Sequence, residues 1–97
     1  MLVRIVHMHF TKEQVEKFLE IFSESADAIR QMDGCNNLQL LRGVDDHCHF
    51  TTISHWDSAE HLENYRSSSL FKSVWGRVKP MFDQKPLAYS LGQVIRH

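Results

Sequence analysis

Hydrophobic and polar residues alternate from Leu2 to Phe10, which predicts a β-strand because successive side chains of a strand point to opposite faces. One face would carry Val3, Ile5, His7 and His9, and the other Leu2, Arg4, Val6, Met8 and Phe10. The residues that follow predict the start of a helix. Thr11 and Gln14 match a capping box, and Phe10 and Val15 occupy the positions of a hydrophobic staple.

The first helix is predicted from Val15 onward, because apolar residues recur there at the spacing of one helical face. They are Val15, Phe18, Leu19, Phe22, Ala26 and Ile29. Gly34 is expected to end this helix, since glycine readily adopts the left-handed conformation that closes many helices. A short apolar strand from Leu38 to Leu41 and a hairpin loop from Gly43 to Asp46 are predicted to follow.

The segment from His47 to Trp56 alternates again and predicts the third strand. Asp57 or Ser58 is expected to cap the next helix because short polar side chains accept the free N–H groups of a first turn. Glu60 is placed to close a capping box from Asp57.

The rest of the chain predicts a second helical segment and a closing strand. Ser67 to Ser69 interrupt the helix, which resumes at Leu70 until Pro80 restricts it, and Leu87 to Arg96 forms the last strand. The order strand, helix, strand, strand, helix, strand is that of a ferredoxin-like α+β domain, with helices on one face of an antiparallel sheet. Residues 1–97 are expected to form a single domain.

A sheet covered by helices on one face leaves its other face to water or to a partner. In the closing strand one face would hold Leu87, Tyr89, Leu91, Gln93 and Ile95. This is not the charged surface of a solvated sheet. A face-to-face homodimer would bury it, with a cavity between sheet and helices or between the two sheets.

The charge balance argues against large charged partners. Eleven lysines and arginines stand against 12 aspartates and glutamates without blocks of one sign, so neither nucleic acid nor a membrane is expected as a partner. The first residues lack the apolar core of a signal peptide, and no stretch reaches transmembrane length. We therefore expect a cytoplasmic protein whose two cysteines are reduced.

Histidines are the sharpest chemical signal, since five of the seven fall in the first and third predicted strands. Alternation places His7 and His9 on one face of the first strand and His47, His49 and His55 on one face of the third. If these faces line one cavity, an imidazole can take the proton of an acidic phenol near neutral pH. His7, His9, His49 and His55 are therefore the candidate catalytic bases. The alternative is that they are polar residues at a sheet edge or dimer interface.

No metal site is predicted from the His47-Cys48-His49 tripeptide, because in a strand Cys48 points away from both histidines. Trp56 stands at the junction of strand and helix and is interpreted as a core anchor. The candidate substrate-binding residues are aromatic and lie on the helices that would cover a cavity: Tyr65, Phe71 and Trp75. Ordinary helix packing is the alternative role for them.

Three short motifs occur at the predicted element boundaries. They are Met32-Asp33-Gly34-Cys35 before the second strand, Trp56-Asp57-Ser58-Ala59-Glu60 between strand and helix, and the helix from Tyr65 to Phe71. Together they resemble the antibiotic biosynthesis monooxygenase superfamily of small dimeric α/β-barrel proteins, over nearly the whole chain. The resemblance implies a homodimer and, for some members, oxidation of small aromatic substrates by O₂ without flavin or metal.

The superfamily also contains haem-degrading enzymes, whose Asn, Trp and His constellation can be compared by position. Trp75 falls where their haem-ligating His would lie, Tyr65 where their Trp would lie, and Val6 or His7 at the Asn position. None of these matches, and haem iron needs an axial donor such as imidazole. No haem and no other cofactor is therefore predicted.

The leading functional prediction, from the resemblance and the strand histidines, is cofactor-independent oxidation of a small aromatic or quinol-like compound by O₂ in a pocket of a homodimer. Two alternatives stay open. One is a non-catalytic small-molecule-binding or interaction protein of the same fold. The other is a proton-transfer enzyme such as an isomerase, which needs a base but no oxygen.

Overall fold

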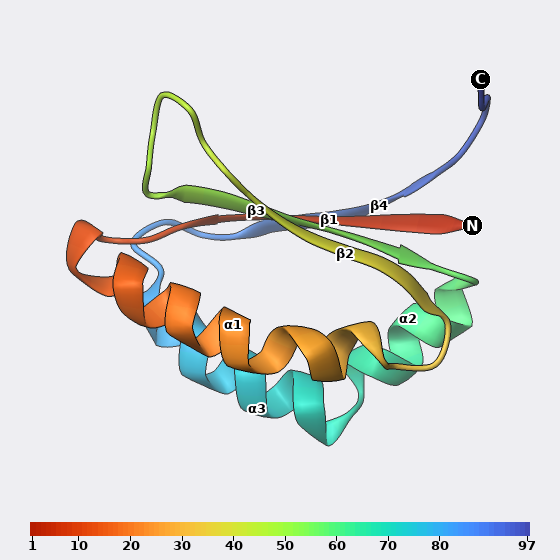
Figure 1. Cartoon of the computed structure of the whole chain (residues 1–97), viewed down its shortest axis with the longest axis horizontal. Coiled ribbons are helices and arrows are strands. Elements are labelled where there is room, and N and C mark those ends of the chain that lie inside the picture. The colour runs from red at the N-terminus through yellow and green to blue at the C-terminus, as the bar shows by residue number, and fades with distance from the viewer.

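Three α-helices lie on one side of a four-stranded sheet in the computed structural model, which describes all 97 residues (Figure 1). The elements are β1 (Leu2–His9), α1 (Val15–Arg30), β2 (Cys35–Arg42), β3 (His49–Trp56), α2 (Ala59–Arg66), α3 (Ser69–Val78) and β4 (Leu87–Gly92). Short 3-10 helices at Lys12–Gln14 and Lys79–Met81 precede α1 and follow α3. None of the helices combines the length and the apolar character needed to cross a membrane.

The sheet has the strand order β2-β3-β1-β4, with all neighbours antiparallel, which confirms the predicted ferredoxin-like α+β fold. Several predicted strand bounds are wrong. β2 runs from Cys35 to Arg42 rather than from Leu38 to Leu41, because it pairs with β3 over its whole length. β1 ends at His9, and Phe10 forms only an isolated bridge with Phe82. β3 begins at His49 rather than His47, because Asp46 accepts the N–H groups of Cys48 and His49 in a turn. β4 ends at Gly92 rather than Arg96, because Gly92 pairs with Leu2, the first residue of β1.

The two faces of the sheet carry different side chains. The inner face, toward the helices, carries Leu2, Arg4, Val6 and Met8 of β1 and Phe50, Thr52, Ser54 and Trp56 of β3. The outer face carries Val3, Ile5, His7 and His9 of β1 and His49, Thr51, Ile53 and His55 of β3. The alternation predicted for both strands is therefore correct, and the helices cover the more apolar of the two faces.

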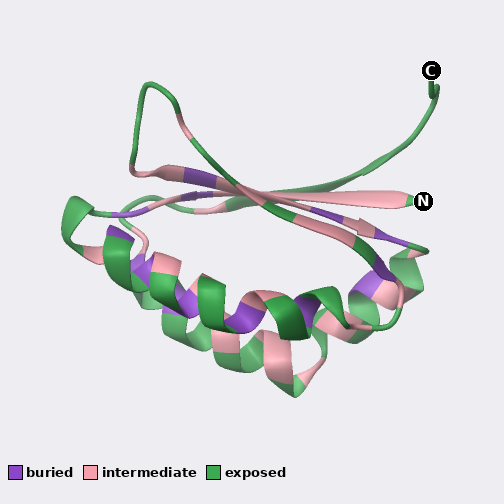
Figure 2. Ribbon diagram, in the orientation of Figure 1, coloured by how far each residue is buried: buried purple, intermediate pink, exposed green.

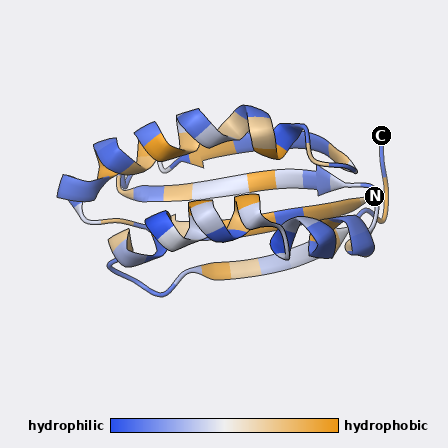
Figure 3. Ribbon diagram, turned by 90° about the horizontal axis from the view of Figure 1, so that it is seen from below, coloured by the Kyte–Doolittle hydropathy of each residue, from blue (hydrophilic) through white to orange (hydrophobic).

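The core lies between the helices and the inner face, where Figure 2 shows the buried residues. Its largest side chains with almost no exposure are Phe10, Phe18, Phe50 and Trp56. The Phe10 and Phe18 rings stack with centroids 4.2 Å apart. Seen from the helix side, hydrophobic and hydrophilic stretches alternate along α1, as in an amphipathic helix (Figure 3). Trp56 is the core anchor that the sequence predicts.

The predicted capping box at the start of α1 is wrong. Thr11 makes no side-chain hydrogen bond to the helix, and its carbonyl oxygen accepts the Gln14 N–H at 3.0 Å in a 3-10 turn. Phe10 is fully buried and bridged to Phe82, so the chain turns tightly right after it. Phe10 and Val15 lie in one buried cluster, as the staple pattern predicts.

Serine side chains cap both later helices. The Ser58 hydroxyl accepts the His61 N–H at 3.2 Å, and the Ser68 hydroxyl accepts the Phe71 N–H at 3.1 Å. The predicted capping box from Asp57 to Glu60 is wrong, because the Asp57 carboxylate accepts a hydrogen bond from the Asn36 amide at 2.7 Å instead. The serine run thus ends α2 and starts α3, as the predicted interruption requires.

Gly34 closes the turn between α1 and β2 in the left-handed conformation, with a φ of 83°. Its carbonyl oxygen accepts the Asp57 N–H at 2.8 Å, which ties this turn to the end of β3. A Cβ atom at this position would lie 2.6 Å from the Cβ of His61. Both the backbone angle and the close approach of α2 therefore require glycine.

Gly34→Ala is expected to lower the free energy of unfolding by about 1–3 kcal/mol, because left-handed strain and the clash with His61 act together. Gly76→Ala is the matched control, since Gly76 is exposed in α3 and an added Cβ would meet no atom within 4 Å. That variant should gain about 0.5–1 kcal/mol from helix propensity. Urea denaturation measures the free energy of unfolding of both variants. An unchanged midpoint for Gly34→Ala would contradict the requirement for glycine at this position.

Candidate functional site

A mostly apolar cavity of about 250 Å³ lies between the inner face of the sheet and the helices. Thirteen of its 17 lining residues are hydrophobic. Val6 and Ala88 contribute to the sheet side, whereas Phe71 and Trp75 contribute from α3. Ala88 is exposed although it pairs with Val6 on the helix-facing side, so the cavity opens along the β4 edge. This hollow is the candidate site for a small, largely apolar ligand.

Aromatic rings form one wall of the cavity, and the break between α2 and α3 positions them. Tyr65 stacks on the buried Trp56 at 5.0 Å, and the Phe71 ring meets Tyr65 edge-on at 5.2 Å. Trp75 stacks on Phe71 with centroids 5.9 Å apart. All three predicted substrate-binding residues therefore line the same cavity. A flat ring could stack against this wall.

The Tyr65 hydroxyl remains protonated throughout the physiological range. Burial, and to a lesser extent the nearby Cys35 thiol, raise the pKa of Tyr65 to about 12. A phenol with such a pKa can donate a hydrogen bond to a ligand, but it does not act as a base near neutral pH.

Two arginines are the charged residues of the cavity lining. Arg4 extends from the inner face of β1, and Arg66 from the last turn of α2. The pKa of Arg4 lies below its usual value, chiefly because of burial and then because of the positive charge of Arg66, with Glu63 opposing the shift. Arg66 forms an ion pair with Glu63 at 3.4 Å on the surface of α2. The lining includes no histidine, aspartate or glutamate.

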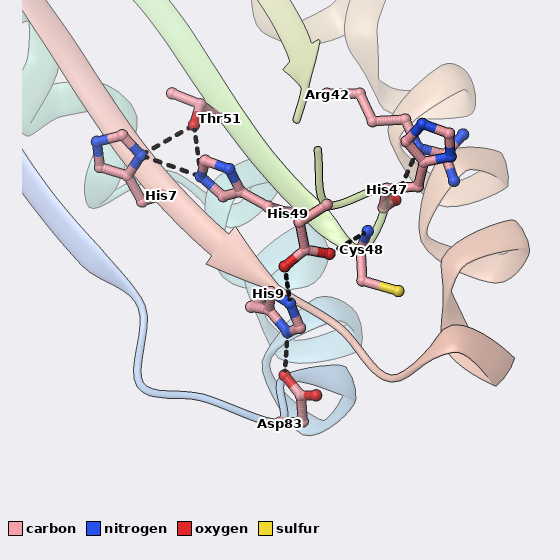
Figure 4. A network of polar contacts seen from close by, with 9 residues as sticks. His7, His9, Arg42, His47, Cys48, His49, Thr51 and Asp83 are labelled. Atoms are coloured by element: carbon pink, nitrogen blue, oxygen red, sulfur yellow. Dashed lines mark hydrogen bonds and ion pairs between the residues drawn. The ribbon is translucent and has the colours of Figure 1, made fainter. Parts of the chain in front are cut away.

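The predicted catalytic histidines lie on the outer face, across the sheet from this cavity. His7 and His49 stack with centroids 5.6 Å apart, and the Thr51 hydroxyl contacts His7 Nδ1 at 2.9 Å and His49 Nε2 at 3.2 Å (Figure 4). His7 also contacts the Tyr89 hydroxyl at 3.1 Å. The structure therefore brings His7 and His49 together but does not bring them to Tyr65, Phe71 and Trp75.

His9 joins two loops through its two ring nitrogens. Its Nδ1 lies 2.7 Å from a carboxylate oxygen of Asp83 (Figure 4). Its Nε2 lies 2.8 Å from a carboxylate oxygen of Asp46. The hydrogen bonds that the ring donates to Asp83 and then to Asp46 raise the pKa of His9. The pKa of Asp46 is lowered, first by the Cys48 N–H and then by His9. His9 thus holds the β2–β3 loop to the segment that precedes β4.

The other two histidines of the predicted set stand apart. His55 pairs with Val3 near the opposite end of β3 from His49, roughly 20 Å away at the rise of a β-strand. His47 lies in the loop before β3, where its carbonyl oxygen accepts a hydrogen bond from Arg42. No group of three His, Cys, Asp or Glu residues has the geometry to hold a metal ion. Both cysteines are free thiols.

The outer face is bordered by exposed apolar side chains. Leu87, Leu91 and Tyr89 of β4 and Leu41 of β2 pair with outer-face residues and are between 37% and 59% exposed. A polar hollow lies at one end of this face, lined by His7, His9, His49 and Asp46 among others. No element of the same chain covers these side chains (Figure 1).

Sequence reasoning missed Arg4 as a site residue, although a signal was present. Arg4 shares the more apolar face of the first strand with Leu2, Val6 and Met8, which is where an unpaired charge is least expected. Asp46 and Asp83 were missed because nothing local relates them to His9. They meet only when the two loops fold over the end of β1.

A sequence model of the family described as antibiotic biosynthesis monooxygenase matches residues 1–75. No curated protein sequence matches the chain significantly. Among solved structures, an antibiotic biosynthesis monooxygenase is similar, with a TM-score of 0.92 and 20% identity over 98% of this chain and 100% of that chain.

A Nitrosomonas europaea protein proposed to be such a monooxygenase superposes with a TM-score of 0.90 and 15% identity over 98% of this chain and 100% of that one. Rv0793 from Mycobacterium tuberculosis superposes with a TM-score of 0.90 and 14% identity, over 98% of this chain and 96% of that one. At these identities the likeness concerns the fold.

The contacts of His9 predict a pH dependence of stability. Because the folded pKa of His9 is raised, its contribution is fully present below the unfolded value of about 6.5 and is lost as the pH rises through the folded value. The stability difference between wild type and His9→Gln should therefore be larger at pH 5.5–6 than at pH 8.5. Urea denaturation at several pH values measures it, with the exposed loop variant His47→Gln as control. An equal difference at all pH values would argue against a charged His9.

Proposed function

Since the chain belongs to the antibiotic biosynthesis monooxygenase family, we propose that it is a monooxygenase that oxidises a small aromatic or quinol-like compound with O₂ and needs neither flavin nor metal. The observation that carries the proposal is the open, mostly apolar cavity with its wall of stacked aromatic rings. Its volume of about 250 Å³ suits a compound of one or two rings.

The proposed reaction begins with an ionised substrate. A hydroxylated ring system that loses a proton becomes electron-rich enough to reduce O₂, and a new C–O bond forms. For an anthrone-like CH₂ group, the carbon loses two hydrogens and gains one oxygen, while the second oxygen leaves as water. The apolar walls would exclude bulk water from this step, and Tyr65 could donate a hydrogen bond to a substrate oxygen.

The proton acceptor depends on where the substrate binds. For a substrate in the inner cavity we propose water at the open β4 edge, because no imidazole or carboxylate lines that cavity. His7, His9, His49 and His55 are proposed as bases only for a substrate held at the outer face, where a second copy of the chain would enclose the imidazoles.

A homodimer through the outer faces is part of the proposal. The exposed leucines and Tyr89 that border the outer face are the side chains that such contact would bury. A C₂ arrangement brings the same patch of both copies together, so no additional partner surface is required. The two sheets would then enclose the stacked His7 and His49 pair.

A non-catalytic small-molecule-binding protein is the second candidate function. It is favoured by the same cavity, which has apolar walls, a protonated tyrosine and two arginines but no base. A ligand that raises the melting temperature without consuming oxygen would support it, since any ligand that binds only the folded state stabilises that state. Turnover under anaerobic conditions would instead indicate a proton-transfer enzyme.

Oxygen consumption with a panel of hydroquinones and anthrones tests the proposed activity. Trp75→Ala should lower kcat/KM about 5- to 100-fold, because it removes the stacking wall of the cavity. Lys72→Ala, an exposed change on the same helix outside the lining, should leave kcat/KM unchanged. No oxygen uptake above buffer with any compound would overturn the monooxygenase proposal.

The paired variant His7→Gln with His49→Gln tests the stacked imidazoles as the base. Activity that survives this change excludes His7 and His49 and leaves the inner cavity, or His9 or His55, as the place of proton transfer. Activity that is lost while the dimer persists in gel filtration places the reaction at the outer face.

A further inference from the structure

Arg4 occupies an unusual position for a charged side chain. It lies on the inner face of β1, a central strand, where it pairs with Ser54 of β3 and Ser90 of β4. Its guanidinium donates a hydrogen bond to the Ser90 hydroxyl at 3.2 Å and forms no ion pair with a carboxylate. A half-buried guanidinium with one neutral partner has most of its five N–H donors free.

Arg66 adds a second positive charge at the same part of the cavity. It lines the cavity together with Arg4 and is close enough to lower the pKa of that residue. The carboxylate nearby is Glu63, which is 65% exposed and bonded to Arg66 across one turn of α2. One solvated carboxylate thus stands near two guanidiniums and pairs with only one of them, so this end of the cavity carries a net positive charge.

We propose that the cavity binds a small aromatic carboxylate, with its ring against Tyr65, Phe71 and Trp75 and its carboxylate between Arg4 and Arg66. This inference rests on the proposed use of the cavity as the substrate pocket and names the class of compound that it takes. A planar guanidinium offers paired N–H donors that match the two oxygens of a carboxylate. The charge of the ligand would also relieve the repulsion between the two arginines.

The charge pattern of the lining supports an acid over a neutral ring compound. The polar groups on the sheet side near Arg4 are the short hydroxyl side chains Thr52 and Ser54, and Ser54 already accepts the Trp56 indole N–H at 2.9 Å. No acidic side chain in the lining competes for the guanidiniums. A neutral ligand would fill the apolar part of the cavity but would leave Arg4 without a carboxylate partner, because the one ion pair nearby joins Arg66 to Glu63.

Isothermal titration with two compounds of equal ring size tests the inference: 2-naphthoate and the neutral 2-naphthylmethanol. Wild type should bind the acid about 10- to 100-fold more tightly, as expected for charge-assisted hydrogen bonds. Arg4→Gln should abolish this preference while leaving the affinity for the alcohol unchanged. Arg66→Gln should reduce the preference. Arg77→Gln, an arginine of α3 that is paired with Glu24 at 3.9 Å, is the matched control and should retain it.

Arg4→Lys keeps the test informative if Arg4→Gln does not fold. It retains the positive charge but loses the paired N–H donors, so its preference for the acid over the alcohol should be intermediate. Equal affinity of wild type for acid and alcohol, a preference that survives Arg4→Gln, or no binding of any one- or two-ring acid would overturn the inference. Binding and oxygen uptake are separate measurements. Acid binding, with no oxygen uptake from any hydroquinone or anthrone, would overturn the monooxygenase proposal alone. Oxygen uptake from neutral hydroquinones or anthrones, with no binding of any acid, would overturn only the inference that the ligand is a carboxylate.

Discussion

A four-stranded sheet has two faces, and the helices of this chain cover only one of them. The remaining structure follows from this constraint. The large rings that need burial, Phe10, Phe50 and Trp56, belong to the helix side, whereas the imidazoles of β1 and β3 are left on the other. The sheet therefore separates two kinds of chemistry. An apolar cavity with cationic side chains lies on one side, and a network of imidazole, hydroxyl and carboxylate groups lies on the other.

The cavity is lined from both of the clusters into which the core is divided. One cluster contains Phe10 and, from α1, Phe18, and the other contains Trp56 and, from α2, Leu62. A row of rings from Trp56 through Tyr65, Phe71 and Trp75 to Phe82 and Phe10 connects the clusters. Between Tyr65 and Phe71 the Ser68 hydroxyl joins the two helices, since it donates to the Tyr65 carbonyl oxygen and accepts the Phe71 N–H. Tyr65, Phe71 and Trp75 of this row form one wall of the hollow, and the restart of the helix after Ser68 positions Phe71 and Trp75 in that wall.

Periodicity predicts the elements of this fold well because each strand and helix shows its own period, and the order of elements then limits the topology to very few arrangements. It fails where distant residues decide a local detail. Thr11 and Gln14 have the letters of a capping box, yet the burial of Phe10 and its bridge to Phe82 tighten the turn and leave the threonine side chain unused. The end of β4 similarly depends on where β1 begins.

The site is less predictable than the fold for a related reason. Alternation correctly groups His7 with His9 and His49 with His55, but grouping alone does not say which face the helices cover. The apolar side chains of Val6, Met8 and Phe10 on the opposite face do indicate which face the helices cover. By the same reasoning Arg4 belongs to the core side, where it is a more informative residue than any of the histidines. The aspartates that hold His9 could not be inferred, because their loops meet it only in three dimensions.

The two tryptophans occupy environments that make them separate optical reporters. Trp56 has no solvent exposure and donates its indole N–H to Ser54, so its emission follows the integrity of the fold. Trp75 is half-buried in the cavity wall, so its emission responds to whatever replaces water beside it. A chain with Trp56 replaced by phenylalanine would thus carry one fluorophore, at the wall where a ligand would stack. The occupancy of the cavity could then be followed in solution without a label.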